Sequence, residues 1–208
     1  AVGVCTGTLV GRRTVLTAAH CLDKKGQKSQ FIVHDANGKG TVANVVKFAL
    51  APGYAPLPDK GVTLEQFFAS PDIAVARIDR DLPARPIPIA ADPPVVGTFI
   101  TIVGYGATGT NVSDAGRSKR MATNFIRGIE DDHVWLEGSA VALGLSCGGD
   151  SGGPALVRAG AGEAVAATTH FGNCTTFSAY TRADVFKSWI ARASGGDVTF
   201  AEETGLPN

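Results

Sequence analysis

The chain has 208 residues, and its 19 basic and 19 acidic side chains give a formal net charge of zero. This balance shows no basic stripe for nucleic acid, and no apolar run is long enough to span a bilayer. We therefore expect no nucleic-acid partner and no membrane partner. The length allows a substantial core, in one domain or in two small ones. The first residues carry no signal-peptide pattern, so we expect a processed or trimmed form.

Short apolar segments rich in β-branched residues recur along the chain, separated by clusters of Gly, Pro, Asn and Asp. This pattern predicts the strands of an all-β sandwich or barrel. The predicted strands include residues 14–16, 31–33, 42–48, 73–78, 99–103, 134–136 and 164–168. Residues 35–40, Asp-Ala-Asn-Gly-Lys-Gly, predict a hairpin turn because Asn-Gly tolerates positive φ. A calcium loop would need more acidic ligands.

Two later segments depart from the strand pattern. Residues 82–96 contain Pro83, Pro86, Pro88, Pro93 and Pro94. Proline denies a sheet its donors, so this stretch is predicted to link two domains. Residues 183–193 carry apolar side chains at helical spacing and stop before two glycines, which predicts a C-terminal helix. The tail over 197–208 has no clear pattern.

The four cysteines allow three pairings, and none of them forms a Cys-x-x-Cys pair. A zinc knuckle or a thioredoxin-type site is therefore not expected. Structural disulfides would imply an oxidising compartment, so we expect a secreted or periplasmic protein. The alternative is four buried free thiols.

Residues 148–154, Gly-Gly-Asp-Ser-Gly-Gly-Pro, place Ser151 in a loop of nearly bare backbone. Glycines let such a loop take sharp angles and point its amide hydrogens into a reaction site. A glycine-rich turn before a strand is the alternative, but it does not account for two earlier motifs. These are residues 17–21, Thr-Ala-Ala-His-Cys, and residues 71–75, Pro-Asp-Ile-Ala-Val.

The order His20, Asp72, Ser151 resembles that of the trypsin-like (chymotrypsin-fold) serine proteases. Further matches run from about Val4 to about Ala193 and include residues 52–54 (Pro-Gly-Tyr), 104–106 (Gly-Tyr-Gly) and 180–182 (Tyr-Thr-Arg). The resemblance implies an all-β fold of two six-stranded antiparallel Greek-key barrels, with the active site in the cleft between them. The expected parts are barrels over 1–93 and 94–182, a helix over 183–194 and a tail over 195–208.

The resemblance also implies the chemistry of a serine endopeptidase. Ser151 would be the nucleophile, His20 its general base and Asp72 the group that orients His20. The backbone amides of Gly149 and Ser151 would form the oxyanion hole. Disulfides would join Cys5 to Cys21 and Cys147 to Cys174. The mechanism needs no metal and no other cofactor; its partners would be polypeptide substrates and protein protease inhibitors, and we expect a monomer.

The same resemblance places the substrate pocket. Leu145, six positions before the nucleophile, would lie at its floor, followed by Ser146, with Phe171 and Ser178 near its walls. Burying a cationic side chain there would need an acidic residue, so cleavage after Arg or Lys is not expected. Small or medium apolar side chains are predicted instead. Thr169 aligns with the residue whose hydroxyl usually contacts the triad aspartate.

The chief departure from the family pattern concerns Asp150. Typical members bury a free terminal amine against this aspartate, but here four residues precede Cys5. Either upstream residues are missing or Asp150 is held differently, as by an arginine in some bacterial relatives. The candidate cations are Arg117, Arg120 and Arg127, which the sequence does not rank.

The three other histidines do not lie in a motif like the one around His20. We predict that His34 and His133 lie on the surface and that His170 contacts substrate. Two other hypotheses about function stay open: a catalytically silent binding or regulatory protein on this fold, and an inactive precursor or trimmed form. The intact His20, Asp72 and Ser151 argue against the silent protein.

Overall fold

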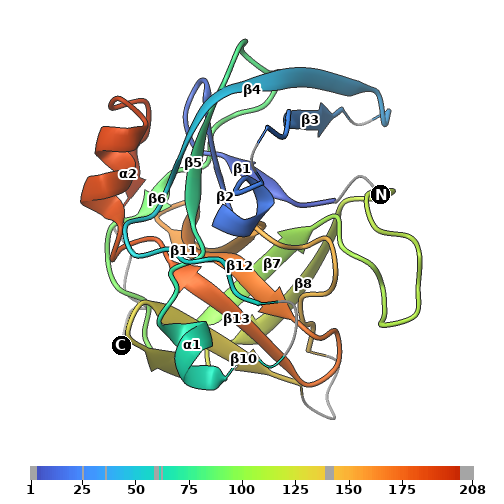
Figure 1. Ribbon diagram of the computed structural model, residues 1–208, viewed down its shortest axis with the longest axis vertical. Helices are drawn as coiled ribbons and strands as arrows, with labels where there is room; N and C mark the ends of the chain where they lie inside the picture. The colour runs from blue at the N-terminus through green and yellow to red at the C-terminus, as the bar shows by residue number, and fades with distance from the viewer. Residues whose placement is uncertain are drawn as a thin grey trace.

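A computed structural model describes residues 4–24, 26–35, 37–58, 61, 63–138 and 143–201. Figure 1 shows two curled sheets stacked one above the other, with a short helix, α2, beside the upper one. The fold class expected from the sequence is confirmed.

The first sheet has its strands hydrogen-bonded in the order β1-β2-β5-β4-β3, all antiparallel. The strands are β1 (Gly7–Leu9), β2 (Thr14–Thr17), β3 (Gln30–His34), β4 (Gly40–Leu50) and β5 (Ala74–Ile78). Thr17, the last residue of β2, pairs with Ala74, the first of β5. Because the two strands are antiparallel, the chain leaves β2 and enters β5 at the same end of this pair of strands.

The hairpin turn predicted between β3 and β4 is confirmed. The Asp35 carboxylate accepts hydrogen bonds from the backbone amides of Asn37 and Lys39, both at 2.9 Å. Gly38 has φ +79°, the positive backbone angle that this turn requires.

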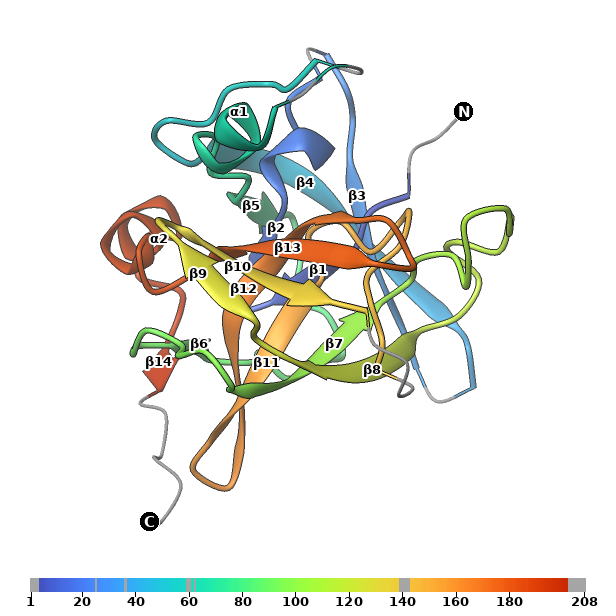
Figure 2. The same cartoon turned by 90° about the horizontal axis from the view of Figure 1, so that it is seen from below.

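The second sheet runs in the order β8-β7-β11-β12-β13-β10-β9; in addition β6 pairs with β12, and β14 pairs with β6. Its strands are β6 (Ile89–Ala90), β7 (Phe99–Gly104), β8 (Arg120–Phe125), β9 (Gly128–Glu130), β10 (His133–Glu137), β11 (Pro154–Ala159), β12 (Gly162–Gly172), β13 (Phe177–Arg182) and β14 (Phe200–Ala201). Figure 2 views the same sheet from below.

β6 and β14 fall in segments for which the sequence predicts no strand. Ile89 of β6, in the proline-rich stretch, pairs in parallel with Val165 of β12 and with Phe200 of β14. Each of these strands has two residues, too few to show an alternating pattern. The proline-rich stretch and the end of the chain therefore both contribute to the second sheet.

The helices are short. They are the 3-10 turn η1 (Ala19–Cys21) and the α-helices α1 (Leu64–Phe68) and α2 (Lys187–Ala193). α2 lies inside the segment predicted as helical. α1 is missed from the sequence because five residues are too few for a helical period; its start is fixed by a capping box between Thr63 and Gln66. None of the described helices has the length and hydropathy to cross a membrane.

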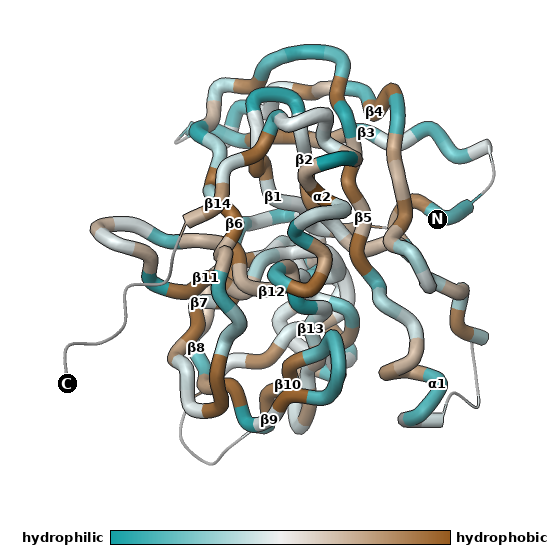
Figure 3. Tube along the Cα trace, turned by 90° about the vertical axis from the view of Figure 1, so that its left-hand side faces the viewer, coloured by the Kyte–Doolittle hydropathy of each residue, from teal (hydrophilic) through white to brown (hydrophobic). Residues whose placement is uncertain are grey.

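The apolar core has three parts, one under each sheet and one that joins them. The joining cluster brings Leu16 and Val75 of the first sheet against Leu156 and Val165 of the second and Ile190 of α2. In Figure 3 the brown, apolar residues follow strands such as β5, whereas teal segments mark many of the connecting loops. This shared core packs the two sheets against each other and fixes their relative position.

Both predicted disulfides are confirmed: Cys5 is bonded to Cys21, and Cys147 to Cys174. The first closes a separation of 16 residues and the second one of 27. Loops of this size are worth about 3 kcal/mol each in the chain-entropy account. The first bridge includes the last residue of η1, and the second begins four residues before Ser151.

Asp197 ties the segment after α2 to the first sheet. Its carboxylate accepts from the amides of Arg12 and Arg13 (3.1 and 2.8 Å), the Thr14 hydroxyl (2.8 Å) and the Arg77 guanidinium (2.9 Å). Burial alone would raise the pKa of Asp197, but these hydrogen bonds outweigh it and lower the pKa below the usual 3.8.

We expect Asp197→Ala to cost about 2 kcal/mol in the free energy of unfolding at pH 7, because it leaves several part-buried donors unpaired. Since the folded pKa is lowered, the stabilisation is present above pH 3.8 and is lost as the pH falls through the folded pKa. Urea unfolding at pH 7 and pH 3 measures this, and the difference between variant and parent should shrink at pH 3.

Asp81→Ala is the control for Asp197→Ala. Asp81 pairs with the exposed side chains of Arg12 and Arg13, and solvent screens such exposed pairs so that they contribute little to stability. An equal loss of unfolding free energy in the two variants would contradict the stabilising role of the Asp197 hydrogen bonds.

Candidate active site

His20 and Asp72 form a hydrogen-bonded pair at the end of the first sheet where β2 ends and β5 begins. The His20 Nδ1 lies 2.5 Å from Asp72 Oδ2, and the backbone amide of His20 donates to Asp72 Oδ1 at 2.8 Å. The Asp72 side chain is 1% exposed, whereas 41% of the His20 side chain is exposed. The carboxylate is therefore fixed inside, and the imidazole keeps an edge open to a reactant.

The loop that carries Ser151 packs against the segment before His20. The Ser151 carbonyl accepts from the Thr6 amide at 2.8 Å, and the Cys21 Sγ lies 3.8 Å from the same oxygen. A Cβ built on Gly152 would come within 2.2 Å of Thr17 Oγ1 and 2.5 Å of the Ala18 nitrogen. Residues 151–152 and 17–21 are thus in backbone contact across the two sheets.

Two peptide groups of this loop have their orientation set by carbonyl hydrogen bonds. The Gly148 carbonyl accepts from the Ala107 amide at 2.9 Å, and the Asp150 carbonyl accepts from the Gly153 amide at 2.8 Å. Since N–H and C=O of a trans peptide point in opposite directions, the amides of Gly149 and Ser151 point away from these partners. Neither amide donates to any residue in the described part of the chain.

Thr6 braces the same loop from the start of β1. Its hydroxyl donates to the Gly149 carbonyl at 2.9 Å and accepts from the Tyr105 amide at 3.0 Å. Sequence reasoning missed Thr6, since a threonine beside a cysteine carries no signal of a contact 143 residues away.

Asp150 is held by backbone amides. Its Oδ1 accepts from Gly106 at 2.7 Å and its Oδ2 from Cys147 at 2.9 Å. Burial raises the pKa of Asp150, against the two amides and the charge of Arg120, which lower it. Of the three predicted cations, Arg120 acts on Asp150, and it does so indirectly: its guanidinium donates to the Gly106 carbonyl (2.7 Å) and pairs with Asp114 (2.8 Å).

The surroundings of Asp72 correct the prediction for Thr169. The Thr169 hydroxyl donates to the Gly153 carbonyl at 3.0 Å, and Asp72 is faced instead by His170, whose Nε2 lies 3.7 Å from Oδ2. The cause is an irregularity in the pairing of β12 with β13 between Thr169 and Phe171. His170 itself is 7% exposed, so it faces Asp72 from inside the protein, and its contact with substrate stays a prediction.

The prediction that His133 is a surface residue is wrong. His133 is fully buried at the start of β10, and its Nε2 lies 3.0 Å from the Nδ1 of His170. No sequence signal relates the two, because they lie 37 residues apart. His34 is exposed as predicted, with its ring against Tyr105.

The residues predicted to form the substrate pocket occupy different environments. Leu145 packs against the core of the second sheet. Ser146 and Ser178 are buried, and the Ser146 amide donates to the Ser178 hydroxyl at 2.9 Å. Thr169 is buried as well, whereas Phe171 is 45% exposed. None of the five is acidic.

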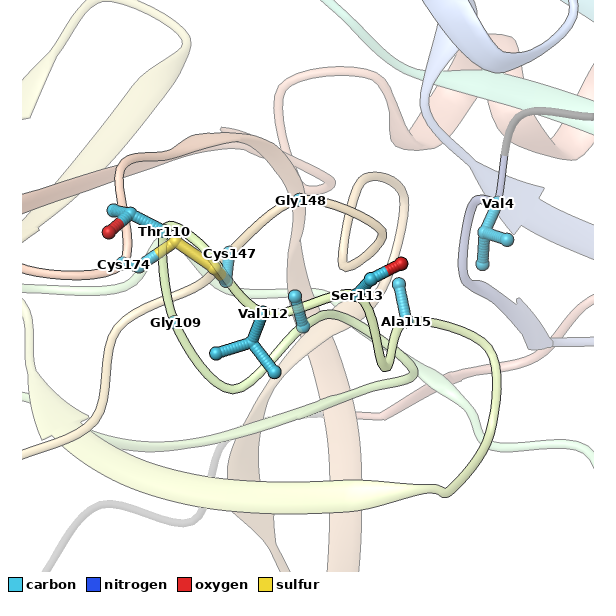
Figure 4. Close-up of a pocket in the computed structure, with 10 residues that line it drawn as sticks. Val4, Gly109, Thr110, Val112, Ser113, Ala115, Cys147, Gly148 and Cys174 are labelled. Atoms are coloured by element: carbon cyan, nitrogen blue, oxygen red, sulfur yellow. A yellow bond between two sulfur atoms is a disulfide. The ribbon is translucent and has the colours of Figure 1, made fainter. Parts of the chain in front are cut away.

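A pocket of about 400 Å³ lies beside the Ser151 loop. Its lining includes Gly148, the Cys147–Cys174 bridge, Val4 and residues of the segment 107–115. Figure 4 shows the disulfide at one end, Val4 at the other and Val112 between them. None of the five residues predicted for the substrate pocket lines it.

One group of potential metal-ligand atoms occurs in the described residues, formed by Cys5, His20 and Cys21. The two cysteines are bonded to each other, so neither offers a thiolate. The group therefore does not fit a metal ion.

The protonation of His20 should control activity. Burial alone would lower its pKa, but the hydrogen bond and charge of Asp72 outweigh it and raise the pKa above 6.5. A general base works deprotonated, so kcat/KM should fall as the pH drops through a midpoint above 6.5. Peptide hydrolysis measured from pH 5 to 9 tests this, and a flat profile would exclude His20 as the base.

The sequence model of the Trypsin family matches residues 2–190. The chain belongs to the Trypsin family. Among curated trypsin-family relatives, it is 30% identical over 183 residues to CLIP domain-containing serine protease B10 of Anopheles gambiae, covering 74% of this chain and 50% of that protein. It is 28% identical over 209 residues to human granzyme M, covering 91% of this chain and 75% of the relative.

The chain thus spans half the length of the Anopheles protein. Among solved structures, human heparin binding protein is similar with a TM-score of 0.70 at 20% identity, over 94% of this chain and 88% of that one. At this identity the likeness establishes the fold.

Proposed function

We propose that this trypsin-family chain is a secreted serine endopeptidase in which Ser151, His20 and Asp72 form the catalytic triad. The observation that carries the proposal is the buried Asp72 carboxylate hydrogen-bonded to the part-exposed His20, whose neighbour Cys21 lies 3.8 Å from the Ser151 carbonyl. Trypsin-like proteases act on polypeptides, and the two disulfides suit an extracellular setting.

In the proposed reaction, His20 Nε2 takes the Ser151 proton as Oγ bonds to the scissile carbonyl carbon. The amides of Gly149 and Ser151 receive the oxyanion, and such a donor is typically worth about 3 kcal/mol. His20 then gives the proton to the departing amine. Water, deprotonated by His20, hydrolyses the acyl-enzyme and restores Ser151.

The proposed preference is for small or medium apolar residues before the scissile bond. Leu145 and Ser146 bring no negative charge to the predicted floor, so a buried Arg or Lys would remain unpaired. A Cβ on Gly172 would come within 2.1 Å of the Ser146 carbonyl, and the Cys174 amide donates to that carbonyl at 3.1 Å. These contacts pack residues 172–174 against the Ser146 backbone beside the predicted floor, which supports a preference for a short side chain.

Digestion of a peptide library tests the proposal, with fragments sequenced by mass spectrometry. Cleavage after Ala or Val that Ser151→Ala abolishes would support it, and dominant cleavage after Arg or Lys would refute the specificity. No cleavage by folded protein would favour the silent binding or precursor hypotheses. The zero net charge gives no reason to transfer the heparin binding named for the structural relative.

A further inference from the structure

A buried pair of histidines lies behind the triad aspartate. His170 Nε2 is 3.7 Å from Asp72 Oδ2, the same oxygen that contacts His20. Its other ring nitrogen is 3.0 Å from His133 Nε2, and His133 Nδ1 is 2.7 Å from Asp132 Oδ1, without the alignment of a hydrogen bond. Asp132, His133, His170 and Asp72 thus form a row of neighbouring side chains, and Asp72 in turn contacts His20.

The backbone of β12 turns His170 toward Asp72. Both faces of β12 are covered, since residues 164–170 are all buried. The pairing with β13 shifts between Thr169 and Phe171. Such irregularities re-aim a side chain and occur often beside active sites.

Aromatic side chains of α1 cover this histidine pair. The Phe67 ring stacks on His170 with centroids 4.0 Å apart and an interplanar angle of 12°, and Phe68 lies edge-on to His133. Figure 1 shows α1 over β13 and β10. This cover leaves His170 only 7% exposed.

Thr181 provides a second connection between Asp72 and the pair. Its hydroxyl oxygen accepts from the Asp72 amide at 3.1 Å and lies 3.4 Å from His133 Nε2. The backbone and the carboxylate of Asp72 therefore both face the same buried cluster.

The neighbours determine where His170 carries its hydrogen. Burial lowers the pKa of His170 to about 3, against the charge of Asp72, which raises it. His170 is therefore neutral at working pH and has one N–H. The nearby Asp72 carboxylate favours that hydrogen on Nε2, which leaves Nδ1 to accept from His133 Nε2–H. The His133 Nδ1 contact with Asp132 lacks the alignment of a hydrogen bond, so the aligned contact at Nε2 is the one through which His133 donates.

We propose that His170 is a positioning residue of the triad, which His133 holds with its Nε2–H directed at Asp72. The N–H dipole stabilises the carboxylate and keeps it aligned with His20. It also competes with His20 for the same oxygen, which moderates the basicity of His20. The kinetic consequences rest on the proposed endopeptidase function, whereas the state of the histidine rings does not.

The charged groups around His20 and His170 determine what the His170→Phe variant changes. His20 is acted on by Asp72, Asp23 and Lys24. His170 is acted on by Asp72, His133, His20 and Asp132. Changing His170 to Phe removes one ring beside Asp72 and leaves Asp72, Asp23 and Lys24 in place around His20.

NMR of the full chain labelled with ¹⁵N and ¹³C histidine tests the proposal. The ¹⁵N shifts should place the His170 hydrogen on Nε2 in the unmodified protein. In His170→Phe the titration midpoint of His20 should rise by about 0.5 pH units, because Asp72 loses a competing donor. His170→Gln, which keeps an N–H, should restore it, and His34→Phe, an exposed control, should not change it.

Kinetics of the same variants give the second arm. His170→Phe should lower kcat by about fivefold at unchanged KM, the pattern of a group that acts on the transition state. A change in KM at constant kcat would place His170 in the substrate groove and overturn the proposal. A hydrogen on Nδ1, or an unmoved His20 midpoint in His170→Phe, would also overturn it.

The two proposals fail in different ways. Absence of peptide hydrolysis by the unmodified chain would remove the endopeptidase function, and the histidine titrations would still decide the role of His170. If His170→Phe does not fold, the ¹⁵N shifts of the unmodified protein decide instead.

Discussion

Replacing Asp72 with asparagine should lower kcat by about 10⁴-fold at neutral pH, with KM little changed. Asp72 accepts two hydrogen bonds from His20, one from its backbone amide and one from Nδ1. An asparagine can keep the first bond, but its amide turns an N–H toward Nδ1 and stabilises the wrong tautomer. The base then presents a hydrogen, instead of a lone pair, to Ser151.

The matched control is Asp81→Asn. Asp81 is an exposed carboxylate whose partners are Arg12 and Arg13, so kcat should stay within about twofold of the parent. Stopped assays with a cleaved library peptide, together with circular dichroism for folding, measure both variants. An Asp72→Asn protein with more than a tenth of the parent kcat would contradict the role of Asp72.

Gly152→Ala should unfold or inactivate the protein. Gly152 has φ +80°, and an added Cβ would lie 2.2 Å from Thr17 Oγ1 and 2.5 Å from both the Ala18 nitrogen and the Thr6 carbonyl. Backbone strain and overpacking together should cost about 3 kcal/mol or more. Any relief must move the Ser151 loop away from residues 17–21, and a shift of about 1 Å costs about 100-fold in rate.

Gly38→Ala is the control for backbone strain without overpacking. Gly38 has nearly the same φ, +79°, but nothing lies within 4 Å of its Cβ position. We expect a loss of about 1 kcal/mol and an unchanged kcat/KM. Urea unfolding and kcat/KM of the two variants give the comparison. Equal losses at the two glycines would show that the contact with residues 17–21 does not matter.

The elements that the sequence predicts well have strong local patterns. The segments around residues 42–48, 73–78 and 164–168 are largely apolar and contain β-branched residues, and all three form strands. Asp72 and His20 are predicted from their motifs, and the pairing of β2 with β5 brings them together. Here local pattern and long-range pairing agree.

The missed features depend on contacts between distant segments. Thr6 acts through the Gly149 carbonyl, and Phe67 acts by stacking on His170. The burial of His133 and the inward turn of His170 come from strand pairing and from one shift in register. None of these has a local signature, because each residue is ordinary in its own segment and gains its role from packing.

Labelling by a serine-directed sulfonyl fluoride tests the triad most directly. Each molecule of folded protein should gain one adduct, and peptide mapping by mass spectrometry should locate it on Ser151. His20→Ala, compared at equal folded concentration, should remain unlabelled over the same time. Folded parent protein without an adduct, or equal labelling of Ser151 in His20→Ala, would contradict a hydroxyl activated by this histidine.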